Sequence, residues 1–125
     1  MNSMKKKILI VDEAIFSRIC AALLEKEGYC TDVVPDVRKI EDELGKEDLG
    51  LVITSYPYGA HIFEKLQKTR VPTIILSDHV CKDLMLALDD FDKSLSHCLI
   101  KPLDYHHFRA LVNQAMGGLA GSDFR

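Results

Sequence analysis

Polar and charged side chains follow four short apolar runs of this 125-residue chain, and they are the residues best placed for chemistry. Together they offer two carboxylates, two hydroxyls and one ammonium, which are groups that form ionic contacts and hydrogen bonds. A fold that gathers the ends of these runs would bring all five side chains into one crevice. The set is Asp12, Glu13, Ser55, Ser77 and Lys101.

The runs that precede these residues have the composition of buried strands. Branched aliphatic residues dominate each run over three or four positions, which suits strands covered on both faces, as in a parallel sheet. A fifth run alternates more and contains Thr31 and Asp32, so we expect it at a partly exposed sheet edge. The predicted strands are residues 8–11, 29–34, 51–53, 73–76 and 98–100.

Segments with helical periodicity separate the strands, and each carries one apolar face. We expect Gly28 to end the first helix, and Gly117 with Gly118 to end the last. Asp36 and Asp104 are expected to cap the second and fifth helices. The apolar positions are Ile15, Ile19, Ala22 and Leu23; Val37, Ile40 and Leu44; Ile62, Phe63 and Leu66; Leu84, Ala87, Leu88 and Phe91; and Phe108, Leu111, Val112 and Ala115.

The strict alternation of strand and helix predicts an α/β fold with one doubly wound, five-stranded parallel sheet and helices on both faces. For five strands the flavodoxin-like order 2-1-3-4-5 is the common solution, and it places the carboxyl ends of strands 1 and 3 side by side. The length supports a single domain, which we assign to residues 1–116. Residues 117–125 are small and lack periodicity, so we expect a flexible tail or the start of a linker.

Composition narrows the function classes. Sixteen Lys and Arg against nineteen Asp and Glu give a net charge of -3 without a basic face, which argues against direct nucleic-acid binding. The four cysteines form no C-x-x-C pair and fit no zinc spacing with the histidines, so we expect buried thiols in a reducing cytosol. The apolar runs are too short for a signal peptide or a membrane span. These features predict a soluble cytoplasmic protein without a membrane partner.

From residue 6 to about 116, the chain resembles the receiver domain of two-component response regulators. The resemblance rests on the order of the motifs at the strand ends. It implies that Asp12 and Glu13 occupy the place of the family's acidic Mg²⁺-binding pair. Ser77 occupies the place of a Ser or Thr that contacts the phosphoryl group, and Lys101 with Pro102 that of the family's Lys-Pro pair.

The main departure from the family pattern is at Ser55, where receivers carry the Asp that accepts the phosphoryl group. A serine hydroxyl needs an adjacent general base to act as a nucleophile, and no histidine is expected beside Ser55. The missing carboxylate would also be a metal ligand, so Asp12 and Glu13 are expected to bind Mg²⁺ weakly at most. We expect no other cofactor and no catalytic residue.

Two further departures from the family pattern concern the position of the switch residue and the loop after residues 51–53. Receivers usually place a Tyr or Phe three residues before the lysine, and this chain has Cys98 there. The loop after residues 51–53 lacks the family's longer Pro and Gly segment.

With no acceptor Asp, we expect the Lys101 ammonium to pair with Asp12 or Glu13.

These residues predict a degenerate receiver: a signalling domain, not an enzyme, that acts by binding proteins without being phosphorylated. A sensor kinase or an effector domain is the expected partner, and a homodimer is a further option. Two alternatives stay open: a receiver with a substitute acceptor, for which Asp78 is the nearest carboxylate, and a small-ligand-binding flavodoxin-like domain. The expected interaction face joins the helix near 84–91, the strand 98–100 and the helix near 108–115, and carries Lys82, Asp83, Asp89, Asp90, Lys93, His106 and Arg109.

Overall fold

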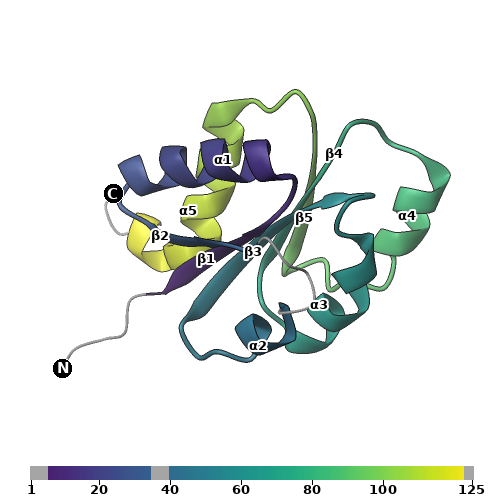
Figure 1. Ribbon diagram of the computed structural model, residues 1–125, viewed down its shortest axis with the longest axis horizontal. Coiled ribbons are helices and arrows are strands. Elements are labelled where there is room, and N and C mark those ends of the chain that lie inside the picture. Colours follow the sequence, from purple (N-terminus) through teal and green to yellow (C-terminus); the bar gives the residue numbers. More distant parts are fainter. Residues whose placement is uncertain (1–5, 35–39, 123–125) are drawn as a thin grey trace.

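A five-stranded parallel sheet runs through the computed structural model, which describes residues 6–34 and 40–122 (Figure 1). The strand order is β2-β1-β3-β4-β5, and every neighbouring pair is parallel. This confirms the predicted fold class and strand order. The strands are β1 (Lys7–Val11), β2 (Cys30–Val33), β3 (Leu49–Tyr56), β4 (Thr73–Ser77) and β5 (Ser96–Ile100).

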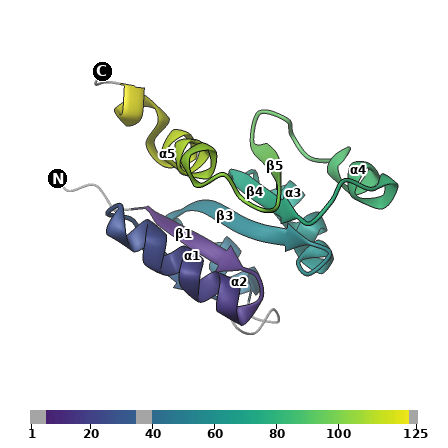
Figure 2. The ribbon, with the colours of Figure 1, turned by 90° about the horizontal axis from the view of Figure 1, so that it is seen from above.

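Helices connect the strands and cover both faces of the sheet (Figure 1). Seen from above, α1 and α5 lie at one end of the molecule and α4 at the other (Figure 2). None of the helices in the described part of the chain is long and apolar enough to cross a membrane. The helices are α1 (Ala14–Lys26), α2 (Ile40–Leu44), the 3₁₀ turn η2 (Ala60–Ile62), α3 (Phe63–Thr69), α4 (Lys82–Leu88) and α5 (Tyr105–Ser122).

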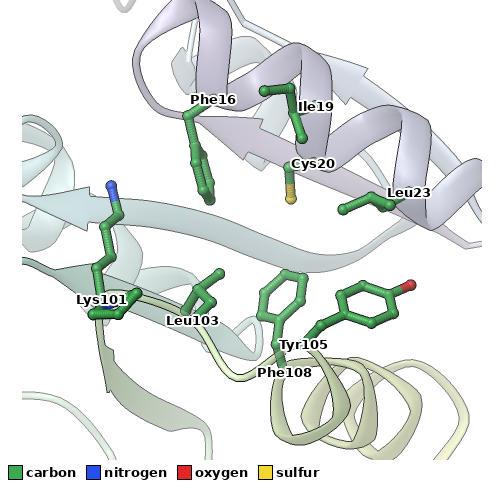
Figure 3. A pocket seen from close by; sticks show the side chains of 9 residues that line it. Phe16, Ile19, Cys20, Leu23, Lys101, Leu103, Tyr105 and Phe108 are labelled. Atoms are coloured by element: carbon green, nitrogen blue, oxygen red, sulfur yellow. The ribbon is translucent and has the colours of Figure 1, made fainter.

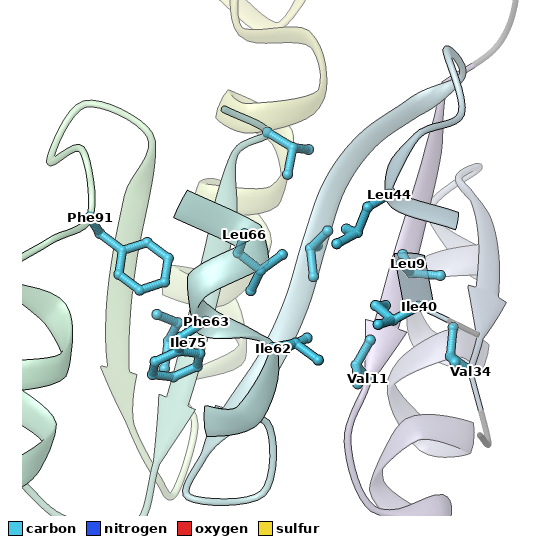
Figure 4. Close-up of a cluster of buried hydrophobic side chains, with 12 residues drawn as sticks. Leu9, Val11, Val34, Ile40, Leu44, Ile62, Phe63, Leu66, Ile75 and Phe91 are labelled. Atoms are coloured by element: carbon cyan, nitrogen blue, oxygen red, sulfur yellow. The ribbon is translucent and has the colours of Figure 1, made fainter. Parts of the chain in front are cut away.

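Two hydrophobic clusters, one on each face, hold the sheet. Because successive strand residues point to opposite faces, Ile8 and Ile10 pack with α1 and α5, whereas Leu9 and Val11 pack on the other side. Figure 4 shows the second cluster, in which α2, η2 and α3 supply the covering side chains. Burial on both faces explains why the strands appear in the sequence as continuous apolar runs.

Element ends follow the predicted capping residues in part. Gly28 ends the turn after α1 with a φ of +99°, a conformation that favours glycine. Asp104 caps α5, because its Oδ1 accepts hydrogen bonds from the backbone N–H groups of His106 at 3.0 Å and His107 at 3.3 Å. Asp36 lies outside the described residues. Gly117 breaks the helical backbone of α5, with a φ of -154° and a ψ of 24°, as predicted, and a second helical segment follows it to Ser122.

Helix α1 has the predicted apolar stripe, but the stripe does not face the sheet. Ser17, Cys20 and Leu24 are the residues it buries. The stripe residues Ile15, Ile19 and Leu23 are 70%, 55% and 38% exposed. The helix therefore carries two faces that could pack, and one of them lies open.

The expectation that all four thiols are buried is also wrong. All four are free cysteines, and only Cys20 is buried. Cys30 is exposed, while Cys81 and Cys98 are half-buried. Cys30 opens the edge strand β2, which has a neighbour on one side only, so its side chain reaches solvent.

Candidate functional site

The sheet brings the predicted site residues to its carboxyl edge. Asp12 directly follows β1, and Lys101 directly follows β5. Ser55 is the last residue but one of β3, and Ser77 is the last residue of β4. The strand register pairs Val11 with Thr54, Tyr56 with Ser77, and Ser77 with Ile100. The topology therefore gathers these residues at one edge, as the sequence predicts.

Asp12 and Ser55 form the centre of this edge. The Ser55 hydroxyl donates a 2.8 Å hydrogen bond to Asp12 Oδ1, and the Glu13 backbone N–H donates to the same oxygen at 2.7 Å. Asp12 is 4% and Ser55 5% exposed. The other oxygen, Asp12 Oδ2, is buried and accepts no hydrogen bond from the described residues. A buried carboxylate is thus held by one hydroxyl and one amide.

Neighbouring hydroxyls fix the backbone around this pair. Ser17 donates to the Asp12 carbonyl oxygen at 2.9 Å, and Thr54 donates to the Val11 carbonyl oxygen at 2.8 Å. Both hydroxyls are buried, and each links two elements at the strand ends. The position of Asp12 is consequently set by α1 and β3 as well as by its own strand.

The loop after β3 closes over Ser55. The Gly59 N–H donates a 2.7 Å hydrogen bond to the Ser55 carbonyl oxygen. A Cβ atom on Gly59 would lie 1.9 Å from Thr54 Oγ1, so only glycine permits this close approach. Gly59 therefore holds the loop close to the end of β3.

The two acidic residues have different environments. Glu13 is exposed, occupies the N-cap position of α1, and makes no side-chain capping hydrogen bond. Asp12 points into the protein and Glu13 does not share its burial. The predicted acidic pocket therefore contains one buried carboxylate, with the second at its rim.

Ser77 is buried, and its hydroxyl donates a 2.9 Å hydrogen bond to the His79 carbonyl oxygen. Its own carbonyl oxygen accepts a 2.7 Å hydrogen bond from the Lys101 backbone N–H. The structure thus joins Ser77 and Lys101 through the backbone. The hydroxyl itself is committed to the turn that follows β4.

The Lys101 side chain does not contact the carboxylates predicted as its partners. Its Nζ lies over the Phe16 ring, 4.5 Å from the centroid, and forms no ion pair with Asp12 or Glu13 (Figure 3). The prediction of an ion pair between Lys101 and Asp12 or Glu13 is therefore wrong. An ammonium loses hydration when it pairs with a buried carboxylate, whereas over a ring at the rim it stays half-exposed and still gains a favourable contact.

Cys98 occupies the middle of β5, in register with Ile75 of β4. It is half-buried, and burial raises the pKa of its thiol. No ring stands at this position to report a change at the strand ends. That Cys98 stands where the family has its switch aromatic remains a prediction from the sequence.

The donor set does not fit a resident magnesium ion. Mg²⁺ requires octahedral oxygen coordination, usually from carboxylates that act together with a substrate phosphate. Here Asp12 alone is a buried carboxylate, one of its oxygens already accepts two hydrogen bonds, and Ser55 supplies a hydroxyl in place of a second acid. Among the described residues, no three His, Cys, Asp or Glu side chains come together as a metal-binding group.

An apolar groove, which the sequence did not predict, lies beside this edge of the sheet. A half-open cavity of about 330 Å³ lies between α1 and the segment that leads from β5 into α5 (Figure 3). Phe16, Ile19 and Leu23 line it from α1, with Leu103 and Phe108 opposite. The periodicity of α1 predicted an apolar face, and its exposure became apparent only with the fold.

Comparison with known proteins finds similar structures but no similar family model or curated sequence. No protein-family model and no curated protein matches the chain. A two-component response regulator from Clostridium difficile superposes with a TM-score of 0.72 at 20% identity, covering 89% of this chain and 95% of that one. The chain has the receiver fold.

Other solved receivers give the same result. A CheY-like receiver domain from Methanospirillum hungatei reaches a TM-score of 0.74 at 16% identity, covering 94% of this chain and 98% of the other. The response regulator TrrA of Thermotoga maritima, in complex with Mg²⁺-BeF, reaches 0.70 at 19% identity, over 88% and 98%.

Proposed function

We propose that this chain is a receiver-like signal transduction domain of the two-component type that acts by binding proteins and is not switched by phosphorylation. The observation that carries the proposal is the Ser55–Asp12 hydrogen bond. It occupies the place where a receiver needs an ionised acceptor. Ser55 is buried, and its only proton is directed at Asp12, so a phosphoryl donor meets no exposed nucleophile.

The position of Lys101 supports the same proposal. In a phosphorylated pocket the ammonium would have to stand beside the transferred group. Here it lies over Phe16, and the Ser77 hydroxyl is bonded to the turn after β4. Both groups would have to converge on one phosphoryl group, and each is engaged elsewhere. We assign the domain no enzymatic activity and no resident cofactor, with Mg²⁺ bound weakly at most, and place it in the cytoplasm.

The face formed by α4, β5 and α5 is the proposed docking surface for a protein partner. It carries exposed charges of both signs on and after α4. Exposed apolar side chains interrupt these charges, as is typical of the apolar centre of an interface. Arg109 is one of the charged residues predicted for this face, but it is not free to bind a partner there, because it forms an ion pair with Glu27 of the turn after α1 at 3.4 Å. The apolar residues are Val80, Met85, Leu86 and Ile100.

A titration with Mg²⁺ and beryllofluoride, a phosphoryl analogue, tests the proposed pocket. Amide resonances of isotope-labelled protein are recorded for the native chain and for a Ser55→Asp variant. We expect no specific shifts around Asp12 and Ser77 in the native chain, and specific shifts in the variant. Saturable shifts at these residues in the native chain would show that the pocket still accepts a phosphoryl group.

The docking face has a separate test. The native chain, a Leu86→Glu variant and an Ile19→Glu variant are each used to capture proteins from a lysate of the source cells. Leu86 lies on the proposed face and Ile19 on α1, and both side chains are exposed, so neither change affects the core. We expect the Leu86→Glu variant alone to lose the specifically captured protein. Unchanged capture by this variant would remove the face from the proposal.

A further inference from the structure

The cavity between α1 and the segment after β5 has the size of a small-molecule site. Its volume of about 330 Å³ lies at the lower end of the ~300–1,000 Å³ range of ligand pockets. Phe16 and Leu23 line it from α1, so it extends for about 10 Å along this helix. Leu103 and Phe108 form the opposite wall (Figure 3). The space therefore suits one narrow molecule of medium length.

Lys101 supplies the one charge among the described residues that line this cavity. Its side chain stands beside Phe16 at one end, whereas Leu23 and Tyr105 lie at the other (Figure 3). The ammonium contacts the Phe16 ring and forms no ion pair with a described residue. The Cys20 thiol in the lining is uncharged at neutral pH, because burial raises its pKa to about 12. An anion at the Lys101 end would therefore meet an unpaired cation.

The lining offers few groups for hydrogen bonding, which argues against an extended peptide as the occupant. The Lys101 backbone N–H already donates to the Ser77 carbonyl oxygen at 2.7 Å, and Pro102 has no N–H. The Tyr105 hydroxyl donates to a Glu27 carboxylate oxygen at 3.3 Å. A peptide in the cavity would leave its own N–H and C=O groups without partners, at a cost in free energy. An alkyl or aryl body carries no such groups.

We propose that this cavity binds a small monocarboxylate with an apolar body, its carboxylate at Lys101 and its body directed along α1 toward Leu23. The carboxylate pairs with the ammonium at a half-exposed rim, where neither ion loses all of its water. The body covers the exposed side chains of Ile19 and Leu23, and burial of this apolar surface supplies most of the affinity. A neutral molecule of the same length lacks the ionic contact, and a cationic one is repelled by Lys101.

Octanoate and octanol test the proposal, because they have the same chain length and differ at the head group. Each is titrated into the isotope-labelled full chain while the methyl resonances of Ile19 and Leu103 are followed. We expect saturable shifts with octanoate and about fivefold weaker binding of octanol. Lys101→Met should remove this preference by weakening octanoate binding alone, and Lys101→Arg should retain it. Equal octanoate affinity of the native chain and Lys101→Met would overturn the proposal, as would a native chain without saturable shifts.

A pair of variants on α1 distinguishes the cavity from the open surface of the helix. Ile19→Glu places a carboxylate in the lining and should weaken octanoate binding at least about tenfold. Ile15→Glu is the matched control, because Ile15 is exposed on the same helix and lies outside the lining. Circular dichroism confirms that each variant folds. Equal weakening by the two variants would show adsorption along α1 and would overturn the proposal.

The proposed site is separate from the residues that carry the proposed function. It uses neither the Asp12–Ser55 hydrogen bond nor the exposed side chains of α4. Failure of octanoate binding would therefore leave the proposed function untouched. Phosphorylation of the native chain would in turn contradict the proposed function and leave the carboxylate site untouched.

Discussion

The Ser55 hydroxyl donates its proton to Asp12 Oδ1 at 2.8 Å, with both side chains almost completely buried. A second carboxylate at this position would repel Asp12, and a cation would be needed to hold the two together. A hydroxyl does the opposite, because it provides a neutral donor to a charged acceptor. Ser55 can therefore lie beside the buried Asp12 carboxylate without a cation between them.

Removal of this hydroxyl should destabilise the fold. In a Ser55→Ala variant, Asp12 loses one of its two donors while it remains buried. We expect the free energy of unfolding to fall by about 1–2 kcal/mol at pH 7. Urea denaturation measures the change, with Ser96→Ala as the control, because the Ser96 hydroxyl bonds an exposed carbonyl oxygen. Equal stability of Ser55→Ala and the native chain would mean that the hydrogen bond has no role in holding Asp12.

Lys101 and Asp12 should behave as independent residues. A double-mutant cycle of Lys101→Met and Asp12→Asn is expected to give a coupling energy below about 0.5 kcal/mol, because no ion pair joins them. The parallel cycle of Lys101→Met and Phe16→Leu should give about 0.5–1 kcal/mol, since the ammonium lies over that ring. Urea denaturation of the variants supplies both values. Larger coupling to Asp12 than to Phe16 would restore the ion pair that the sequence predicted.

The cysteines should differ in reactivity. Burial, with a smaller effect of the Asp12 charge, raises the pKa of Cys20 to about 12, so its thiol stays protonated and inert at pH 8. Cys30 is exposed and should be alkylated first by iodoacetamide. Peptide mapping by mass spectrometry over time measures the order, and protein unfolded in urea is the control in which the difference disappears. Modification of Cys20 at the rate of Cys30 would contradict its burial.

The raised pKa of Cys20 also gives a pH dependence. An unfolded thiol loses its proton near pH 9.0, whereas the folded one keeps it to about 12. The stability associated with the protonated thiol is present below pH 9 and is lost as the pH rises through the folded pKa. A Cys20→Ala variant should therefore lose less stability than the native chain between neutral and strongly alkaline pH, as thermal unfolding over this range would show.

A surface carboxyl provides the corresponding effect in acid. Hydrogen bonds from the Ser94 hydroxyl and backbone N–H, and then one from Arg70, lower the pKa of Asp92. Its contribution to stability is present above the unfolded pKa and is lost as the pH falls through the folded one. Asp92→Asn should be less stable than the native chain at pH 7, with a difference that shrinks on acidification. A difference that does not change with pH would show that ionisation of Asp92 plays no part.

Sequence patterns located the strands well but not their ends. The apolar run 51–53 ends before Thr54, yet β3 continues to Tyr56, because Ser55 and Tyr56 stay in register with Leu76 and Ser77 of β4. Backbone pairing does not require apolar side chains, so hydrophobicity underestimates the length of such a strand. The same extension is what brings Ser55 beside Asp12.

Side-chain directions were the least predictable feature. Periodicity shows that α1 has an apolar face, but Ser17, Cys20 and Leu24 form a second one, and only the packing against β1 and β2 decides between them. The direction of Lys101 depends on a balance between desolvation and contact with Phe16, a residue 85 positions away. Neither outcome follows from local spacing.

The proposal that this chain accepts no phosphoryl group is tested most directly by the intact mass of the protein after incubation with Mg²⁺ and acetyl phosphate. The account predicts no added phosphate on the native chain, with the Ser55→Asp variant run beside it as the positive control. A native chain that gains the mass of one phosphoryl group would contradict the account. Mapping of the adduct would then identify the acceptor, with exposed Asp78 as the first carboxylate to inspect.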